Sequence, residues 1–283
     1  MIDIAFAAIA LIGTAIGAYT DIKTRLVPDW TSYFMLAAGL GGHTILSLLS
    51  QSIWPIVYSA AGAGFFFAIG YLLYRAGVWG GGDAKLLPAI GSLLAFSTSI
   101  AIWPLLVSFW LNLLILGAAF GILGMLILFL KHKEKTLHEF KLLINKFKLP
   151  FYSTIFAVVL FGTVSIFETM AIFGFLLAIL CLLLFILKAT EKAALHKSIP
   201  PNKLVEGDWL IDEIKIGNYC YTPKKIGIEK SDITKLIELE KAGKLKDVKV
   251  KDGIPYVPAF LAALIVTMLG FDIFFWILTN LMV

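Results

Sequence analysis

Two aspartates stand at the edges of apolar segments, where carboxylates could do chemistry. Asp83 follows three glycines in GVWGGGDAKLLPAIG, residues 77–91, and an apolar run begins directly after it. Asp21 follows a first apolar run over residues 2–20. A carboxylate at the boundary of a hydrocarbon layer is costly and marks a candidate functional site. Two carboxylates at close range cannot both ionise easily, so they share a proton and can act as base and acid in one reaction.

The residues around Asp83 suggest how a substrate could approach it. Gly80, Gly81 and Gly82 have no Cβ, so we expect them to adopt backbone angles that other residues avoid. An extended peptide could lie against such a backbone. A proton-sharing pair beside it would resemble the dyad of aspartic proteases, in which one aspartate activates water and the other protonates the carbonyl oxygen.

Each of these residues also has a purely structural interpretation. Asp83 could be the N-cap of the helix that follows it, and Asp21 could be a solvated loop residue. Asp29 competes with Asp21, but it directly precedes the next apolar segment and is interpreted as its N-cap. Glycine-rich turns between helices are common. Only the combination favours Asp21 and Asp83 as the reacting groups.

The composition indicates the elements that must position these groups. The chain has 283 residues, of which 59% are hydrophobic and 15% charged, and its mean hydropathy is +0.89. A soluble domain carries about 25% charged residues, so the sequence predicts an integral membrane protein. A span needs roughly 20 mainly apolar residues. Six segments fit this length: 2–20, 31–50, 53–74, 85–102, 105–130 and 256–282.

The apolar block 151–187 is too long for one ordinary helix. Phe167, Glu168 and Thr169 could form the polar turn of a hairpin within it, which gives eight spans, whereas a single helix gives seven. With eight spans and the N-terminus outside, all 24 Lys and Arg residues lie in segments on the inner side, as the positive-inside rule requires. A seven-span chain would export fourteen of them. Topology and anionic lipid therefore account for the net charge of +5, and no nucleic-acid partner is expected.

The predicted fold is an all-α polytopic membrane protein with about eight transmembrane helices and a small α+β cytoplasmic insert before the last helix. We expect residues 1–187 to form the catalytic helical bundle, with a basic amphipathic interfacial helix over 131–150. Residues 188–255 form the insert, in which Ser231 is predicted to cap a helix. Residues 256–283 form the last transmembrane helix. The apolar N-terminus lacks the positive region of a signal peptide and is interpreted as a retained first span.

This orientation puts Asp21 and Asp83 at the same depth and on the same, inner side of the membrane. Two other polar residues receive structural interpretations. Asn112 is expected to make an interhelical hydrogen bond. Asp272 lies about 24 Å along the last helix from Tyr256 at 1.5 Å per residue, too deep to join the pair.

The motifs around the two aspartates resemble a known family. Gly80 to Asp83 matches the G-x-G-D signature of intramembrane aspartyl proteases. The wider GGGDAKLL resembles the prepilin peptidase form of this signature, as does YTDIKTRLVPD around Asp21. The stretch KDGIPYVPAFLAAL, which follows an insert containing EGD, is similar to the archaeal branch. The chain is thus identified as resembling the archaeal type IV prepilin and preflagellin peptidases.

This resemblance implies a function. Asp21 and Asp83 would be catalytic, and the active-site loop would include the glycines, Lys85 and the segment with Pro258 and Ala259. The enzyme would sit in the plasma membrane and cut the short basic leader from prepilin or preflagellin precursors at the cytoplasmic face. It implies no metal and no cofactor, and membrane lipid is the only other expected partner. The chain lacks the CxxC motifs of many bacterial relatives, so peptidase activity is expected without methyl transfer.

Two other functions fit parts of the sequence. A proton-coupled transporter could use Asp21 and Asp83 as a relay, but transporters of this kind are expected to show repeated halves, which the sequence lacks. A membrane scaffold could bind partners through its insert, but it leaves the GGGD segment unexplained. The peptidase remains the favoured hypothesis.

Overall fold

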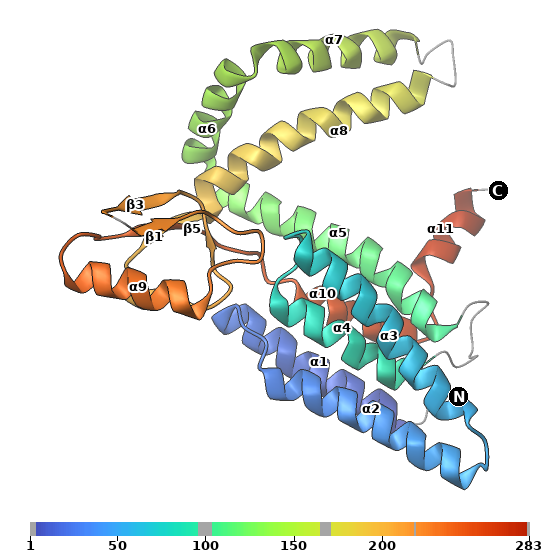
Figure 1. Cartoon of the computed structure of the whole chain (residues 1–283). Helices are drawn as coiled ribbons and strands as arrows, with labels where there is room; N and C mark the ends of the chain where they lie inside the picture. The colour runs from blue at the N-terminus through green and yellow to red at the C-terminus, as the bar shows by residue number, and fades with distance from the viewer. Residues whose placement is uncertain (1–3, 96–103, 165–170, 218, 282–283) are drawn as a thin grey trace.

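The computed structural model describes residues 4–95, 104–164, 171–217 and 219–281. A helical bundle, a splayed helical hairpin and a small strand-containing unit make up this part of the chain (Figure 1). The α-helices are α1 (Ile4–Thr24), α2 (Asp29–Leu49), α3 (Trp54–Arg75), α4 (Gly81–Leu94), α5 (Leu105–Lys131), α6 (Lys133–Lys146), α7 (Lys148–Val164), α8 (Ala171–Thr190), α9 (Lys230–Lys241), α10 (Val257–Met268) and α11 (Ile273–Leu281).

Helix α4 forms the centre of the bundle. Every residue from Leu86 to Leu94 is buried, and the main hydrophobic core joins α4 to α1, α2, α3, α5 and α10. Gly62 of α3 and Gly91 of α4 meet backbone to backbone, a close approach that only small residues allow between membrane helices. With 14 residues α4 is shorter than the expected span 85–102, whose second half lies largely outside the described residues.

The chain is a multi-pass membrane protein. Among the described residues, five helices are long and apolar enough to cross a bilayer: α1, α2, α3, α5 and α8, the last extended by a π-helical turn to Leu195. Two bent helix pairs, α6 with α7 and α10 with α11, raise the number to seven if each pair counts as one span. The expected number of eight is therefore not established.

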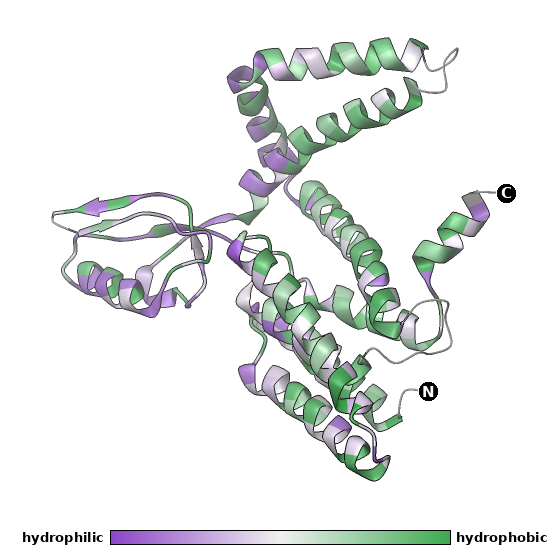
Figure 2. Ribbon diagram, turned by 45° about the vertical axis from the view of Figure 1, so that its right-hand side comes forward, coloured by the Kyte–Doolittle hydropathy of each residue, from purple (hydrophilic) through white to green (hydrophobic). Residues whose placement is uncertain are grey.

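The apolar block 151–187 forms two helices, as the hairpin hypothesis predicts. Phe161 and Gly162 of α7 pack against Gly174 and Phe175 of α8. The predicted turn at 167–169 lies outside the described residues. The hairpin diverges from the bundle (Figure 1), and its helices are apolar, whereas α6 is mostly hydrophilic (Figure 2). Helix α6 makes an angle of 99° with α7, as an interfacial helix next to a span would. It is shorter than the predicted 131–150, because residues 148–150 begin α7.

The prediction of one continuous helix over 256–282 is wrong. Helix α10 ends at Met268, and α11 follows at an angle of 68°. Gly270 adopts the left-handed conformation (φ 76°) after α10, which ends that helix. Asp272 then accepts a hydrogen bond from the Phe275 N–H at 3.0 Å and so caps α11.

Asn112 of α5 stabilises this break. Its side-chain amide donates to the Phe271 carbonyl at 2.9 Å and to the Thr267 hydroxyl at 3.0 Å, and its oxygen accepts from the Ile273 N–H at 2.9 Å. The predicted interhelical hydrogen bond is thus confirmed. The backbone groups freed by the break find partners that a bilayer could not supply.

We expect the substitution Asn112→Leu to destabilise the protein strongly. It keeps the side-chain volume similar but leaves the Ile273 N–H and the Phe271 carbonyl without these partners. Each buried group left unpaired costs about 1–3 kcal/mol. Thermal unfolding in detergent should show a lower midpoint for Asn112→Leu than for Asn280→Leu, a change at an exposed asparagine of α11. Equal midpoints would show that the break does not depend on Asn112.

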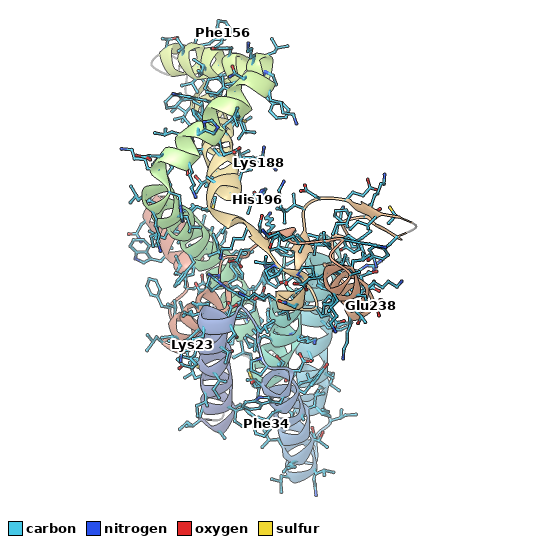
Figure 3. The ribbon with its side chains drawn as sticks, turned by 90° about the vertical axis from the view of Figure 1, so that its left-hand side faces the viewer. Lys23, Phe34, Phe156, Lys188, His196 and Glu238 are labelled. Atoms are coloured by element: carbon cyan, nitrogen blue, oxygen red, sulfur yellow. The ribbon has the colours of Figure 1, made fainter. Side chains whose placement is uncertain are left out.

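Residues 196–251 contain the strands of the insert: β1 (His196–Ile199), β2 (Trp209–Leu210), β3 (Ile214–Ile216), β4 (Tyr219–Tyr221) and β5 (Val248–Lys251). Strand β5 pairs antiparallel with β1 and β2, and β3 pairs with β4. Helix α9 covers a separate hydrophobic core that includes Leu210, Leu236 and Val250. The helix begins earlier than predicted, with Glu229 instead of Ser231 at the N-cap position. Figure 3 shows Lys188 and His196 where α8 leads into the insert, and Glu238 on α9.

Candidate active site

Asp21 lies in the last turn of α1, at the end of the bundle that faces the insert (Figure 1). It is only 8% exposed. Its Oδ2 accepts a hydrogen bond at 3.0 Å from the N–H of Val257, the first residue of α10. Asp21 therefore caps a helix that is more than two hundred residues away in the sequence, and the positive end of that helix stabilises its negative charge.

Asp83 lies in the first turn of α4 and is half-buried. Its Oδ2 accepts a hydrogen bond from the Gly80 N–H at 3.2 Å, so it closes back onto the residue that precedes the helix. The helix begins at Gly81, and Gly80 occupies the N-cap position that sequence analysis assigned to Asp83 as the structural alternative. Both aspartates thus have one oxygen bonded to a backbone N–H at a helix N-terminus.

The three glycines do not adopt unusual backbone angles, contrary to our expectation. Gly80 is extended (φ −72°, ψ 163°), and neither Gly81 nor Gly82 has a positive φ. Gly82 is needed for a different reason, since a Cβ there would lie 3.0 Å from the side chain of Val27. Val27 belongs to the connection between α1 and α2, so Gly82 lets α4 approach the segment that follows Asp21.

The structure brings the two aspartates to one place. Asp21 stands at the end of α1 and Asp83 at the start of α4, and the negative charge of Asp21 acts on Asp83. The negative charge of Asp83 also acts on Tyr256, which directly precedes Val257. The N-terminus of α10 therefore contacts Asp21 through the backbone N–H of Val257. The side chain of Tyr256, the residue before it, lies near Asp83.

An aromatic cluster, which was not predicted from the sequence, joins the segment before Asp83 to the start of α10, the helix that binds Asp21. Trp79, next to the glycines, is 8% exposed. Its ring centroid lies 5.7 Å from that of Tyr256 and 5.4 Å from that of Phe260 on α10, and 6.3 Å from that of Trp110 on α5. The only sequence signal for Trp79 was its position directly before the glycines, because its partners Tyr256 and Phe260 lie far along the chain.

The remaining predicted site residues lie around this centre. Pro258 and Ala259 form the first turn of α10, next to the Val257 N–H that binds Asp21. Lys85 points to Asp29, and its Nζ lies 2.7 Å from the Asp29 carboxylate. The interpretation of Asp29 as an N-cap is wrong, because Pro28 holds that position and Asp29 makes no capping hydrogen bond. Asp29 instead ties the start of α2 to α4.

The part of the chain that carries both aspartates is recognisable among known proteins. Residues 8–131 match the model of the type IV leader peptidase family. The predicted resemblance to prepilin and preflagellin peptidases is thereby confirmed. The match includes Asp21, Asp83 and the glycines and ends with α5, so it does not reach the insert or α10.

Curated relatives give the same result. The chain is 34% identical over 98 residues to prepilin peptidase EppA of Methanothermobacter thermautotrophicus, a match that covers 35% of this chain and 26% of the relative. It is 36% identical over 101 residues to a preflagellin peptidase of Methanococcus voltae, covering 35% and 43%. A preflagellin peptidase of Methanococcus maripaludis is 30% identical over 87 residues, covering 30% and 36%. The chain thus spans less than half the length of these relatives. No solved structure gives a significant match.

Proposed function

We propose that the chain is a membrane-embedded aspartyl endopeptidase. It removes the short basic leader of type IV pilin-like or archaeal flagellin precursors. The observation that carries this proposal is the placement of Asp21 and Asp83 on two different helices, at one end of the bundle, with the charge of Asp21 acting on Asp83. The family match over residues 8–131 supports the same activity.

The two carboxylates supply both groups that peptide hydrolysis requires. With one proton shared, the ionised aspartate takes a proton from a bound water while the water oxygen attacks the scissile carbonyl carbon. The protonated aspartate donates its proton to the carbonyl oxygen. Collapse of the tetrahedral intermediate breaks the C–N bond as the proton taken from water passes to the leaving amine, and a hydroxyl of the intermediate returns a proton to the other aspartate. Each aspartate keeps one hydrogen bond to a backbone N–H, which fixes its orientation.

We propose that this site faces the cytoplasm across the plasma membrane. Helices α1, α3, α5 and α8 each carry a basic residue in the last turn: Lys23, Arg75, Lys131 and Lys188 respectively. These helix ends all lie toward the insert (Figure 1), and Figure 3 labels two of the basic residues, Lys23 and Lys188. The positive-inside rule makes that side cytoplasmic. In this scheme α1–α5 and α10 form the catalytic unit and residues 188–255 a cytoplasmic insert.

The test is cleavage of a tagged precursor whose basic leader precedes an apolar helix. Membranes that contain the wild-type chain should convert it to one shorter product, and mass spectrometry should place the new N-terminus at the leader boundary. The precursor should stay intact in matched membranes without the chain. Cleavage elsewhere, or none with a panel of pilin-like and flagellin-like precursors, would contradict the proposed substrate class.

A further inference from the structure

The insert closely approaches the chain at Gly77, directly before residues 78–83, the catalytic loop. Gly77 is the first residue after the C-cap of α3, and it stands three residues before Gly80. A Cβ on Gly77 would lie 3.0 Å from the carbonyl oxygen of Lys225 and 3.3 Å from its Cβ. Lys225 belongs to the connection between β4 and α9 in the insert. Two segments that are far apart in the sequence therefore meet backbone to backbone just before the active-site glycines.

Gly77 is required here for two separate reasons. Its φ of 73° lies in the left-handed region, as is common after a helix. The N–H of Gly77 donates to the Tyr74 carbonyl at 2.9 Å, and the N–H of Val78 donates to the Leu73 carbonyl at 3.0 Å, which fixes this turn to α3. A side chain would be strained by the backbone angle and would also crowd Lys225, which would have to shift by a few tenths of an ångström.

On the insert side, Lys225 lies in a loop that hydrogen bonds attach to the rest of the insert. The Trp209 indole N–H donates to the Lys225 carbonyl at 3.0 Å. The Ile228 N–H donates to the Asp208 carbonyl at 2.9 Å, and the Gly207 N–H donates to the Ile228 carbonyl at 2.9 Å. Gly227 packs backbone to backbone on Gly207. The loop that carries Lys225 is thus attached to the folded core of the insert, so the position of the insert is transmitted to Gly77.

We propose that the insert positions the catalytic loop, with the Lys225 backbone, oriented by Trp209, supporting Gly77 and thereby setting the place of Gly80–Asp83 relative to Asp21. The expected effect on cleavage rests on the proposed peptidase function, whereas the contact between Gly77 and Lys225 does not. Gly77 and Trp209 act as positioning residues, since neither is placed on the reacting atoms. Loss of the contact should affect turnover more than substrate binding, because the carboxylates require accurate placement in the transition state.

The chain offers a matched control for Gly77. Gly243 follows α9 in the same way, with a φ of 68° and the same pair of hydrogen bonds back to the helix, but a Cβ there meets nothing within 4 Å. Gly77→Ala and Gly243→Ala therefore introduce the same backbone strain, and only the first disturbs a contact. Trp209→Phe removes the N–H that binds Lys225, and Trp54→Phe is its control at an exposed site at the start of α3.

The experiment measures kcat and KM for cleavage of the tagged precursor, together with hydrogen exchange of the amides of residues 78–83, for the full chain in nanodiscs. Gly77→Ala should lower kcat on the order of ten- to a hundredfold at similar KM, and Trp209→Phe should lower it less. Both should speed exchange of these amides, whereas Gly243→Ala and Trp54→Phe should match the wild type.

Equal effects of Gly77→Ala and Gly243→Ala, or wild-type kcat and exchange in Trp209→Phe, would overturn the proposal. If the wild type cleaves no precursor, the proposed function fails, and the exchange rates alone decide whether the insert orders the loop.

Discussion

Asp21→Asn and Asp83→Asn should each abolish precursor cleavage. Asparagine keeps the size of aspartate and an oxygen that can still accept from the Val257 or Gly80 N–H, so the caps on α10 and α4 remain. It cannot share or transfer the proton. General acid–base catalysis contributes roughly 10²–10⁴-fold to rates, and we expect each variant to lose activity of this order. Initial cleavage rates in membranes at equal protein level measure the effect.

The double variant should be no less active than either single variant, because the two groups work as one unit and their effects do not add. Asp29→Asn is the matched control. It is an aspartate at the same end of the bundle whose side chain is 58% exposed, and its partner Lys85 is 43% exposed. A surface ion pair of this kind contributes at most about 1 kcal/mol, so cleavage should stay near the wild-type rate. Wild-type cleavage by Asp21→Asn would refute the pair and favour the proton-relay alternative.

The sequence predicted those features that depend on local signals. Asp21 and Asp83 stand out because carboxylates are rare beside apolar runs, and the charge distribution predicts that both lie on one side of the membrane. The polar break in 151–187 predicts the two helices that the structure shows. The amide side chain of Asn112 in an apolar helix predicts an interhelical bond. For the hairpin and for Asn112, the cost of a polar group in lipid is enough to predict the outcome.

Features that depend on distant partners could not be predicted in this way. The glycines before Asp83 suggested special backbone angles, yet Gly82 is needed because Val27 packs against it. Asp21 caps a helix whose residues lie near the other end of the chain. The break between α10 and α11 needs a bonding partner on α5, and hydropathy alone does not distinguish a broken helix from a continuous one. Tertiary contacts determine all three.

Trp79→Ala should cause the second large loss of activity. Trp79 directly precedes Gly80, and its buried ring joins the catalytic loop to Tyr256 and Phe260 at the start of α10. Since Val257, which follows Tyr256, binds Asp21, this ring contact links the segment directly before Asp83 to the helix that orients Asp21. Removal of the ring leaves a cavity between these elements and lets the loop move. A misplacement of about 1 Å can cost on the order of 10²-fold in rate, and we expect a fall in kcat of this size.

Trp110→Ala separates positioning from general packing. Trp110 of α5 belongs to the same cluster and loses an equal side-chain volume, but it lies outside the catalytic loop, which still contacts Tyr256 and Phe260. Both alanine variants should lower the thermal midpoint in detergent, because truncation of a packed aromatic ring costs several kcal/mol in protein cores, about 3–5. Only Trp79→Ala should also lose most of its kcat, and Trp79→Phe should recover part of it by restoring a ring. If the two alanine variants lose kcat and stability in parallel, Trp79 contributes packing alone. Another contact must then fix the relative positions of the two carboxylates.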